Sequence, residues 1–121
     1  MKSYQDLEVW QRGMNLATLA YTLTGPFPKS ELFGMTSQIR RSASSIPANI
    51  AEGWGRRGTR EFQHFLTIAQ GSLRELETHL LLASRVGLTT VEGIQPLLEE
   101  ATVLGKQLVR LYRALDRRPP A

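Results

Sequence analysis

Two absences limit what this chain can be: it has no cysteine and no long apolar run. Without cysteine it forms neither disulfides nor thiolate metal sites, and nothing points to an oxidising compartment. The longest apolar run is Leu80-Leu81-Leu82-Ala83, which is far too short to cross a bilayer. The first residues, Met1 to Tyr4, lack the apolar segment of a secretory signal peptide. We therefore expect a cytoplasmic protein without membrane contact.

The 121 residues fit one domain, and their net charge is positive. Lysine and arginine number 15 against 11 aspartate and glutamate residues, a formal net charge of +4, and most of the cations are arginine. Arginine makes forked hydrogen bonds to phosphate and carboxylate groups. This charge favours an anionic partner without identifying one, because many bundles that bind no anion carry similar charge.

Four segments carry apolar residues at alternating three- and four-residue spacings, which place them along one face of a helix. Turn-forming glycines and prolines separate the segments, at 25–28, 53–58 and 87. The chain is therefore predicted to be all-α, an antiparallel up-down four-helix bundle over residues 1–115 with a disordered tail at 116–121. The expected core residues are, segment by segment, Leu7, Trp10, Met14, Ala17 and Tyr21; Leu32, Met35, Ile39, Ala43, Ile46 and Ile50; Phe62, Leu66, Ala69, Leu73, Leu76, Leu80 and Ala83; and Ile94, Leu97, Ala101, Leu104, Leu108, Leu111 and Leu115.

Several residues predict where these helices begin, bend and approach one another. Ser30 is expected to cap the second helix, and Thr89 with Glu92 forms a capping box for the fourth. Pro47 falls inside the second helix, so we expect either a kink or a helix in two pieces. Gly71 lies in the middle of the third segment, at a cost of about 1 kcal/mol relative to alanine. Close approach of a neighbouring helix would explain why this glycine is tolerated.

A nine-residue motif with an internal proline, Ser45-Ile46-Pro47-Ala48-Asn49-Ile50-Ala51-Glu52-Gly53, is followed by Trp54-Gly55-Arg56. In this motif the chain resembles the four-helix-bundle family of 23S rRNA intervening-sequence proteins, which are encoded inside inserts in bacterial large-subunit ribosomal RNA genes. The agreement runs from about Tyr4 to Gly87 and is looser afterwards. Three further stretches carry it: Asp6-Leu7-Glu8-Val9-Trp10, Gln38-Ile39-Arg40-Arg41 and Ala69-Gln70-Gly71-Ser72-Leu73-Arg74-Glu75-Leu76-Glu77.

The resemblance implies a small bundle that assembles as a ring-shaped homopentamer. It also implies a relation to the accessory variability protein of diversity-generating retroelements, a basic pentamer that works with a reverse transcriptase and nucleic acid. For most members of the family no biochemical activity is established, so the resemblance predicts fold and assembly more than function.

Arginines on both sides of the motif's end form the candidate nucleic-acid site. Exposed arginines bind phosphates, and a neighbouring aromatic ring offers a base a surface on which to stack. In the alternative interpretation, the tryptophan packs on the bundle end and the arginines pair with Glu52 and Glu61. The predicted contacts are Arg40, Arg41, Arg56, Arg57 and Arg60 to phosphates, with Trp54 as the stacking platform.

The carboxyl-terminal end of the fourth helix carries a second basic group. Cations at this position complement the negative end of the helix dipole, which is sufficient reason for their presence. The group comprises Arg110, Arg113, Arg117 and Arg118.

The third and fourth helices carry more apolar residues than one core face needs. A helix with one face in solvent does not need a second apolar band, so we expect neighbouring subunits to cover this band. The alternative is a wider core within one subunit. The residues predicted at a subunit interface are Phe65, Ile68, Leu81, Leu82, Val109 and Tyr112.

Metal and catalytic motifs are incomplete. A di-iron bundle needs two Glu-x-x-His motifs and two further inward glutamates. Glu61 and His64 form one such motif, but the second is missing, and His79 lies on the same helix as the first. The glycines at 53, 55 and 58 follow a helix and not a strand, so they lack the context of a dinucleotide-binding motif. We therefore expect no enzyme activity, no cofactor and no metal.

Together these features predict a non-catalytic, homo-oligomeric bundle that binds RNA or DNA through its arginine-rich surface. The alternative is a protein–protein adaptor that uses its apolar bands and makes no nucleic-acid contact. The sequence identifies neither the type of nucleic acid nor any protein partner.

Overall fold

The protein is all-α, as predicted. The computed structural model describes residues 2–116, and this range contains no strand. The disordered tail was predicted to begin at residue 116, but α4 includes Asp116, and the rest of the predicted tail lies outside the described residues. The elements are η1 (Tyr4–Asp6), α1 (Glu8–Thr24), η2 (Lys29–Glu31), α2 (Met35–Gly55), α3 (Thr59–Arg85) and α4 (Val91–Asp116), where η marks a short 3₁₀ helix.

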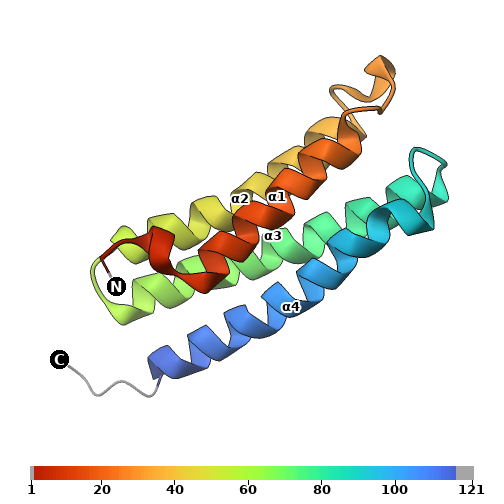
Figure 1. The fold of residues 1–121 in the computed structure, drawn as a ribbon. Helices are drawn as coiled ribbons and strands as arrows, with labels where there is room; N and C mark the ends of the chain where they lie inside the picture. Colours follow the sequence, from red (N-terminus) through yellow and green to blue (C-terminus); the bar gives the residue numbers. More distant parts are fainter. Residues whose placement is uncertain (1, 117–121) are drawn as a thin grey trace.

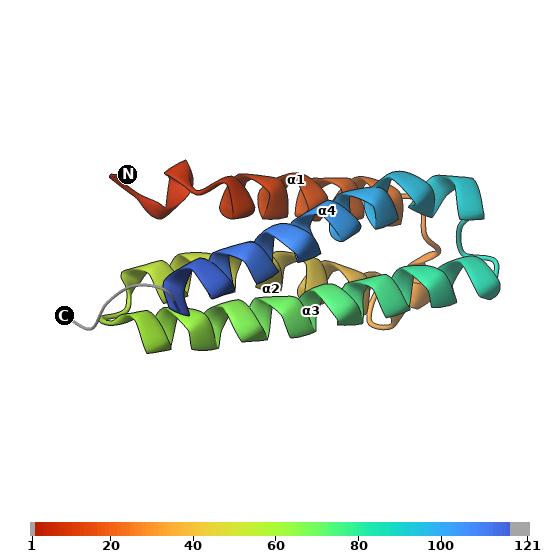
Figure 2. The same cartoon turned by 90° about the horizontal axis from the view of Figure 1, so that it is seen from below.

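The four α-helices lie side by side around one core (Figure 1). α1 packs against α2 and α4, and α3 also packs against α2 and α4. Figure 2 shows the α1–α2 and α3–α4 connections at one end of the molecule. The α2–α3 turn and the last turn of α4 lie at the opposite end. This arrangement is that of a four-helix bundle.

The apolar stripes of α3 and α4 build most of the core, as predicted. In α3 every predicted position from Leu66 to Ala83 is fully buried, and Phe62 at the start of the stripe is partly buried. In α4 every predicted position is buried except Leu111, which is partly buried. Each fully buried leucine contributes about 1.5–3 kcal/mol. These two stripes are therefore a main source of stability.

The core face of α1 agrees with the predicted one only in part: Leu7 and Ala17 are buried as predicted. Leu16 and Ala20 are fully buried, whereas Met14 and Tyr21 of the predicted stripe are 42% and 48% exposed. Both sets follow helical spacing, but the buried set includes Gly13, which a pattern of apolar residues does not count as core. On this face the Cβ position of Gly13 lies 3.5 Å from Ile46 Cγ2 and from Pro47 Cβ, an ordinary van der Waals distance. The less apolar of the two stripes is thus the one that faces the core.

The predicted start of α2 is wrong: the helix begins at Met35 and not after Ser30. Ser30 lies inside η2, and the carboxylate of Glu31 caps α2 by accepting a hydrogen bond from the Met35 backbone nitrogen over 3.0 Å. A carboxylate at this position is also favoured by the helix dipole. Leu32, predicted as core, precedes the helix and is 50% exposed.

Pro47 lies inside one continuous α2, so the prediction of a helix in two pieces is wrong. The alternative, a kink, stays a prediction. Polar side chains surround the proline: Asn49 donates to the Ser45 carbonyl oxygen over 2.8 Å. The Ser45 hydroxyl also shares a 2.8 Å hydrogen bond with that of Ser72, which ties α2 to α3 beside the proline.

The connection from α3 to α4 confirms one predicted helix end and shifts the next helix start. Gly87 follows α3 with φ +83°, the left-handed conformation that ends the helix as predicted. α4 is capped by Thr90, whose hydroxyl oxygen accepts a hydrogen bond from the Gly93 nitrogen over 2.9 Å. The predicted capping box of Thr89 and Glu92 is therefore wrong by one residue. Thr89 and Thr90 are adjacent, and it is the hydroxyl of Thr90 that caps the helix.

Two helical glycines differ in what surrounds them. A Cβ on Gly53 would lie 2.7 Å from Phe65 Cβ and 3.0 Å from Phe62 Cδ1, so α2 and α3 touch at this glycine. Gly71 is exposed, and within the described part of the chain no neighbouring atom lies within 4 Å of its Cβ position. The predicted close approach at Gly71 is therefore wrong for one subunit, and the close approach lies at Gly53.

Alanine substitutions at these two glycines test this contrast. We expect Gly53→Ala to lower the free energy of unfolding by about 1–3 kcal/mol, because the methyl group overpacks the α2–α3 contact. Gly71→Ala should raise it by about 1 kcal/mol through helix propensity. Urea unfolding followed by circular dichroism measures both values. Equal effects of the two substitutions would contradict the assignment of Gly53 as the helix contact.

Candidate nucleic-acid interface

The six residues predicted to bind nucleic acid do not form one cluster. Arg40 and Arg41 lie in the first half of α2, whereas the other four lie at or beside the α2–α3 turn. Because an α-helix rises 1.5 Å per residue, Arg41 and Arg56 are about 22 Å apart along the bundle. The predicted residues thus belong to two separate surfaces.

Arg40 links α2 to the end of α1. Its Nε donates a hydrogen bond to Thr24 Oγ1 over 2.8 Å, and its guanidinium carbon lies 4.6 Å from the centre of the Tyr21 ring. Thr24 is buried, and its hydroxyl donates to the Ala20 carbonyl oxygen over 2.8 Å. These contacts hold the Arg40 side chain between two helices, where it stabilises the fold. Arg41, the next residue, is exposed.

Trp54 and Arg56 both pack against α3. The Trp54 ring is partly buried and meets the Phe62 ring edge to face, with centroids 6.2 Å apart. Arg56 Nη2 lies 2.8 Å from Glu52 Oε2, and the guanidinium carbon lies 5.2 Å from the centre of the Phe65 ring. The hydrogen bond to Glu52 and the charge of its carboxylate raise the pKa of Arg56 above its ordinary value. These contacts match the packing interpretation of both residues.

Arg57 and Arg60 are the unpaired cations of the turn. Both are exposed, and among residues 2–116 no carboxylate lies within 4.0 Å of either guanidinium. Glu61, the other predicted partner, makes no ion pair in this range either. Gly58 adopts φ +92° and lets the chain turn from α2 into α3. The turn therefore presents two free arginines at one end of the bundle.

The residues predicted at a subunit interface do not share one face. Ile68 and Leu82 are 37% and 44% exposed and, two heptads apart, point in the same direction from α3. Leu81 is 47% exposed and points about 100° away from Leu82. Burial of these side chains by another subunit stays a prediction. The remaining three residues of the set are partly buried within the subunit: Phe65, Val109 and Tyr112.

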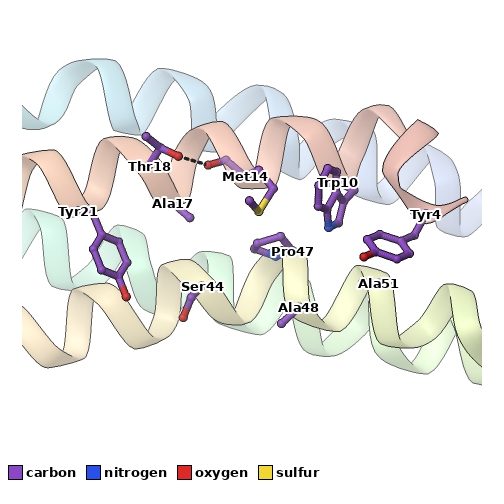
Figure 3. Close-up of a pocket in the computed structure, with 10 residues that line it drawn as sticks. All are labelled: Tyr4, Trp10, Met14, Ala17, Thr18, Tyr21, Ser44, Pro47, Ala48 and Ala51. Atoms are coloured by element: carbon purple, nitrogen blue, oxygen red, sulfur yellow. Dashed lines mark hydrogen bonds between the residues drawn. The ribbon is translucent and has the colours of Figure 1, made fainter.

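A hollow between α1 and α2 was missed by the sequence reasoning. It measures about 480 Å³ and is lined largely by apolar side chains, with Tyr4 and Trp10 toward one end and Tyr21 at the other (Figure 3). Met14 points across it toward Pro47 (Figure 3). The sequence did contain the signal, because Trp10, Met14 and Tyr21 form the stripe that was predicted to face the core. This stripe lines the border between α1 and α2 instead.

The second basic group lies on α4. Arg110 and Arg113 are exposed, and Arg113 stands in the last turn of the helix. Three residues apart, they are neighbours on the helix surface. Arg117 and Arg118 lie outside the described residues.

The described residues offer neither a metal cluster nor a membrane span. Between residues 2 and 116 no three potential ligands among His, Asp and Glu come together. Glu61 and His64 are exposed, and the His64 ring meets Phe65 edge to face with centroids 5.5 Å apart. None of the helices in this range combines the length and the apolarity that crossing a bilayer requires.

Similarity to known proteins covers most of the chain. The family model for 23S rRNA-intervening sequence protein matches residues 5–110. Four chains of solved structures match, among them a crystal structure of a protein with unknown function from the S23 ribosomal protein family of Bacteroides thetaiotaomicron VPI-5482. That structure has a TM-score of 0.77 and 27% sequence identity, over 86% of this chain and 97% of the other. A comparison with curated proteins finds no match.

The different surroundings of Arg40 and Arg57 predict different effects on stability. Arg40→Ala should lower the free energy of unfolding by about 1–2 kcal/mol, because it loses the hydrogen bond to Thr24 and the contact with the Tyr21 ring. Arg57→Ala should change it by less than about 0.5 kcal/mol, as is usual for exposed residues. Urea unfolding of both variants measures the difference. Coincident unfolding curves would mean that Arg40 does not hold α1 to α2.

Proposed function

Since the chain belongs to the family of 23S rRNA-intervening sequence proteins, we propose that it is a non-catalytic homo-oligomer that binds RNA or DNA through its arginine-rich surface. The observation that carries the proposal is the pair of exposed arginines at the α2–α3 turn, Arg57 and Arg60, with which no carboxylate of the described residues pairs. An arginine without a protein carboxylate is available to phosphate oxygens, and arginine–phosphate pairs are among the stronger hydrogen bonds.

The proposed contacts are to phosphates and not to bases. Trp54 and Arg56 are held by Phe62 and Glu52, so neither is counted among them. Phosphate contacts carry no sequence information, and their strength falls steeply with salt because binding releases counterions. Binding at this surface should therefore depend little on sequence and strongly on ionic strength.

Self-association is proposed from the exposed apolar side chains on α3. Ile68 and Leu82 each expose more than a third of their surface on the same side of the helix. Covering them by a second subunit gains about 25 cal/mol for each Å² of apolar surface removed from water. In an assembly every subunit presents its own turn, so weak phosphate contacts add up through avidity. The family resemblance favours a pentamer.

A second candidate function is a protein–protein adaptor, and the hollow between α1 and α2 favours it. Tryptophan and tyrosine are enriched among the residues that dominate protein interfaces, and Trp10 and Tyr21 line this hollow. In such an adaptor the free arginines would serve solubility alone. Nucleic-acid binding that depends on Arg57 and Arg60 would decide against this function.

The double variant Arg57→Gln/Arg60→Gln tests the proposed surface. We expect about tenfold weaker binding at low salt, and for single strands a salt dependence of log K that is shallower by about 1.4, because two phosphate contacts are lost. Fluorescence anisotropy with labelled structured RNA, single-stranded DNA and duplex DNA, at low and physiological salt, measures both. A matched control, Lys29→Gln/Arg85→Gln, removes the same charge from exposed residues near the opposite end of the bundle. If both variants lost the same affinity, the cause would be the lower net charge and not the loss of contacts at the turn.

The double variant Ile68→Glu/Leu82→Glu tests self-association. Two carboxylates on the exposed face of α3 should convert the oligomer into monomer, because burying them at an interface costs far more than burying the apolar side chains. Light scattering coupled to size-exclusion chromatography measures the mass. Val91→Glu, at a 63% exposed position on α4, is the control and should leave the mass unchanged. A wild-type protein that is already monomeric would refute the proposed assembly.

A further inference from the structure

Four cations line a groove between α3 and α4, and no carboxylate of the described part of the chain lines it. Its volume is about 470 Å³. α3 contributes Arg74, and α4 contributes Lys106, Arg110 and Arg113. The other residues of its wall are uncharged, among them Gly105.

The three cations of α4 form a row along the helix. Lys106, Arg110 and Arg113 follow one another at four- and three-residue intervals, the spacing of neighbours on a helix surface. At 1.5 Å per residue the row is about 10 Å long. Within residues 2–116 no carboxylate lies within 4.0 Å of any of the three. Glu8, which lines an adjacent hollow together with Arg110, accepts a hydrogen bond from Gln107 instead.

Arg74 lies beside the row, on the side of α4 where Gly105 stands. Arg74 Nη2 lies 3.3 Å from the position that a Cβ on Gly105 would take, and Leu73 Cδ2 lies 3.4 Å from it. Gly105 is buried in the middle of α4, where glycine costs about 1 kcal/mol relative to alanine. The room that it leaves for Arg74 and Leu73 is a physical reason for this cost. Glu77 holds the Arg74 guanidinium through a 2.6 Å ion pair.

The helix dipole does not account for the row. Its effect is confined to the last turn of a helix, and α4 ends at Asp116. Arg113 stands in that turn, but Lys106 lies about 15 Å before the helix end. Arg110 also precedes the last turn. Two of the three cations therefore need another explanation, and solubility does not require them to line the same groove.

We infer that the groove between α3 and α4 binds the phosphodiester backbone of a nucleic acid. The inference rests on the proposed function and adds a second binding surface to it. The row is as long as about three phosphate-to-phosphate intervals of one strand, each of which advances 3.4 Å along the axis of B-form DNA. Arg113 belongs to the last turn of α4, and this end of α4 lies at the same end of the bundle as the α2–α3 turn (Figure 1). One nucleic acid can therefore contact both surfaces.

The triple variant Lys106→Gln/Arg110→Gln/Arg113→Gln tests the inference in the anisotropy titration described above. Loss of three phosphate contacts should weaken binding by more than about tenfold at low salt and make the salt dependence shallower by about 2 for single strands. The control, Lys2→Gln/Lys29→Gln/Arg85→Gln, removes the same charge from exposed residues outside the groove and should bind like wild type. Thermal unfolding by circular dichroism should show that both variants are folded.

A second variant has the opposite expected effect. Glu77→Gln removes the carboxylate partner of Arg74 and leaves the α4 row intact. A freed Arg74 adds a phosphate contact, so binding should tighten severalfold and the salt dependence should steepen. A groove whose cations serve only the fold would show no tightening.

The outcomes separate this inference from the proposed function. If Arg57→Gln/Arg60→Gln weakens binding while the α4 triple variant binds like its control, the groove is not a binding surface and the proposed function stands. If the triple variant weakens binding and the turn variant does not, the groove replaces the turn as the main contact. If wild-type protein binds none of the three nucleic acids at low salt, both the inference and the proposed function are wrong.

Discussion

Burial of the α3 stripe between α2 and α4 is the constraint from which the other features follow. Because the predicted stripe positions from Leu66 to Ala83 are fully buried, α3 has one fixed rotation about its axis. That rotation turns one flank toward Gly53 of α2, where a Cβ would lie 2.7 Å from Phe65 Cβ, and the other toward Gly105 of α4, where it would lie 3.4 Å from Leu73 Cδ2. It also leaves Ile68 and Leu82 on the outside. The candidate assembly face and the wall of the basic groove are therefore consequences of the core.

The sequence predicted α3 and α4 well and α1 less well, for a physical reason. A long seven-residue repeat of large apolar side chains defines a single face, so the cores of α3 and α4 follow from spacing. α1 has two helical stripes, and apolar spacing predicts that the stripe with the larger apolar residues faces the core. The stripe that faces the core instead includes Gly13, which a pattern of large apolar residues does not count as core. The predicted start of α2 at Ser30 is several residues too early, because the carboxylate that accepts from the Met35 nitrogen belongs to Glu31 in the short helix before it. The predicted cap of α4 at Thr89 is one residue too early, because the adjacent Thr90 accepts the hydrogen bond instead.

Residue type alone did not predict which arginines of the candidate site are free. Arg40 is held by Thr24, 16 residues away in the chain, and this contact exists only once α1 has packed against α2. Arg56 is held by Glu52, one helical turn earlier, which helical spacing does predict. Arg57, the next residue, has no such partner between residues 2 and 116. Fewer arginines are therefore available to a nucleic acid than the sequence predicts, because contacts within the protein hold Arg40 and Arg56.

Some cations of this protein are paired with carboxylates, whereas within residues 2–116 those of the α4 row are not. This difference indicates which kind of anion the α4 row can bind. Arg12 of α1 bonds Glu100 of α4 over 2.9 Å, so this cation, which joins two helices, is paired with a carboxylate. The α4 row has none among the described residues, although unpaired like charges repel one another. Its length of about 10 Å exceeds the screening length of about 8 Å at physiological salt. A small anion at one end of the row is therefore screened from the other end, whereas a chain of phosphates contacts every cation at once.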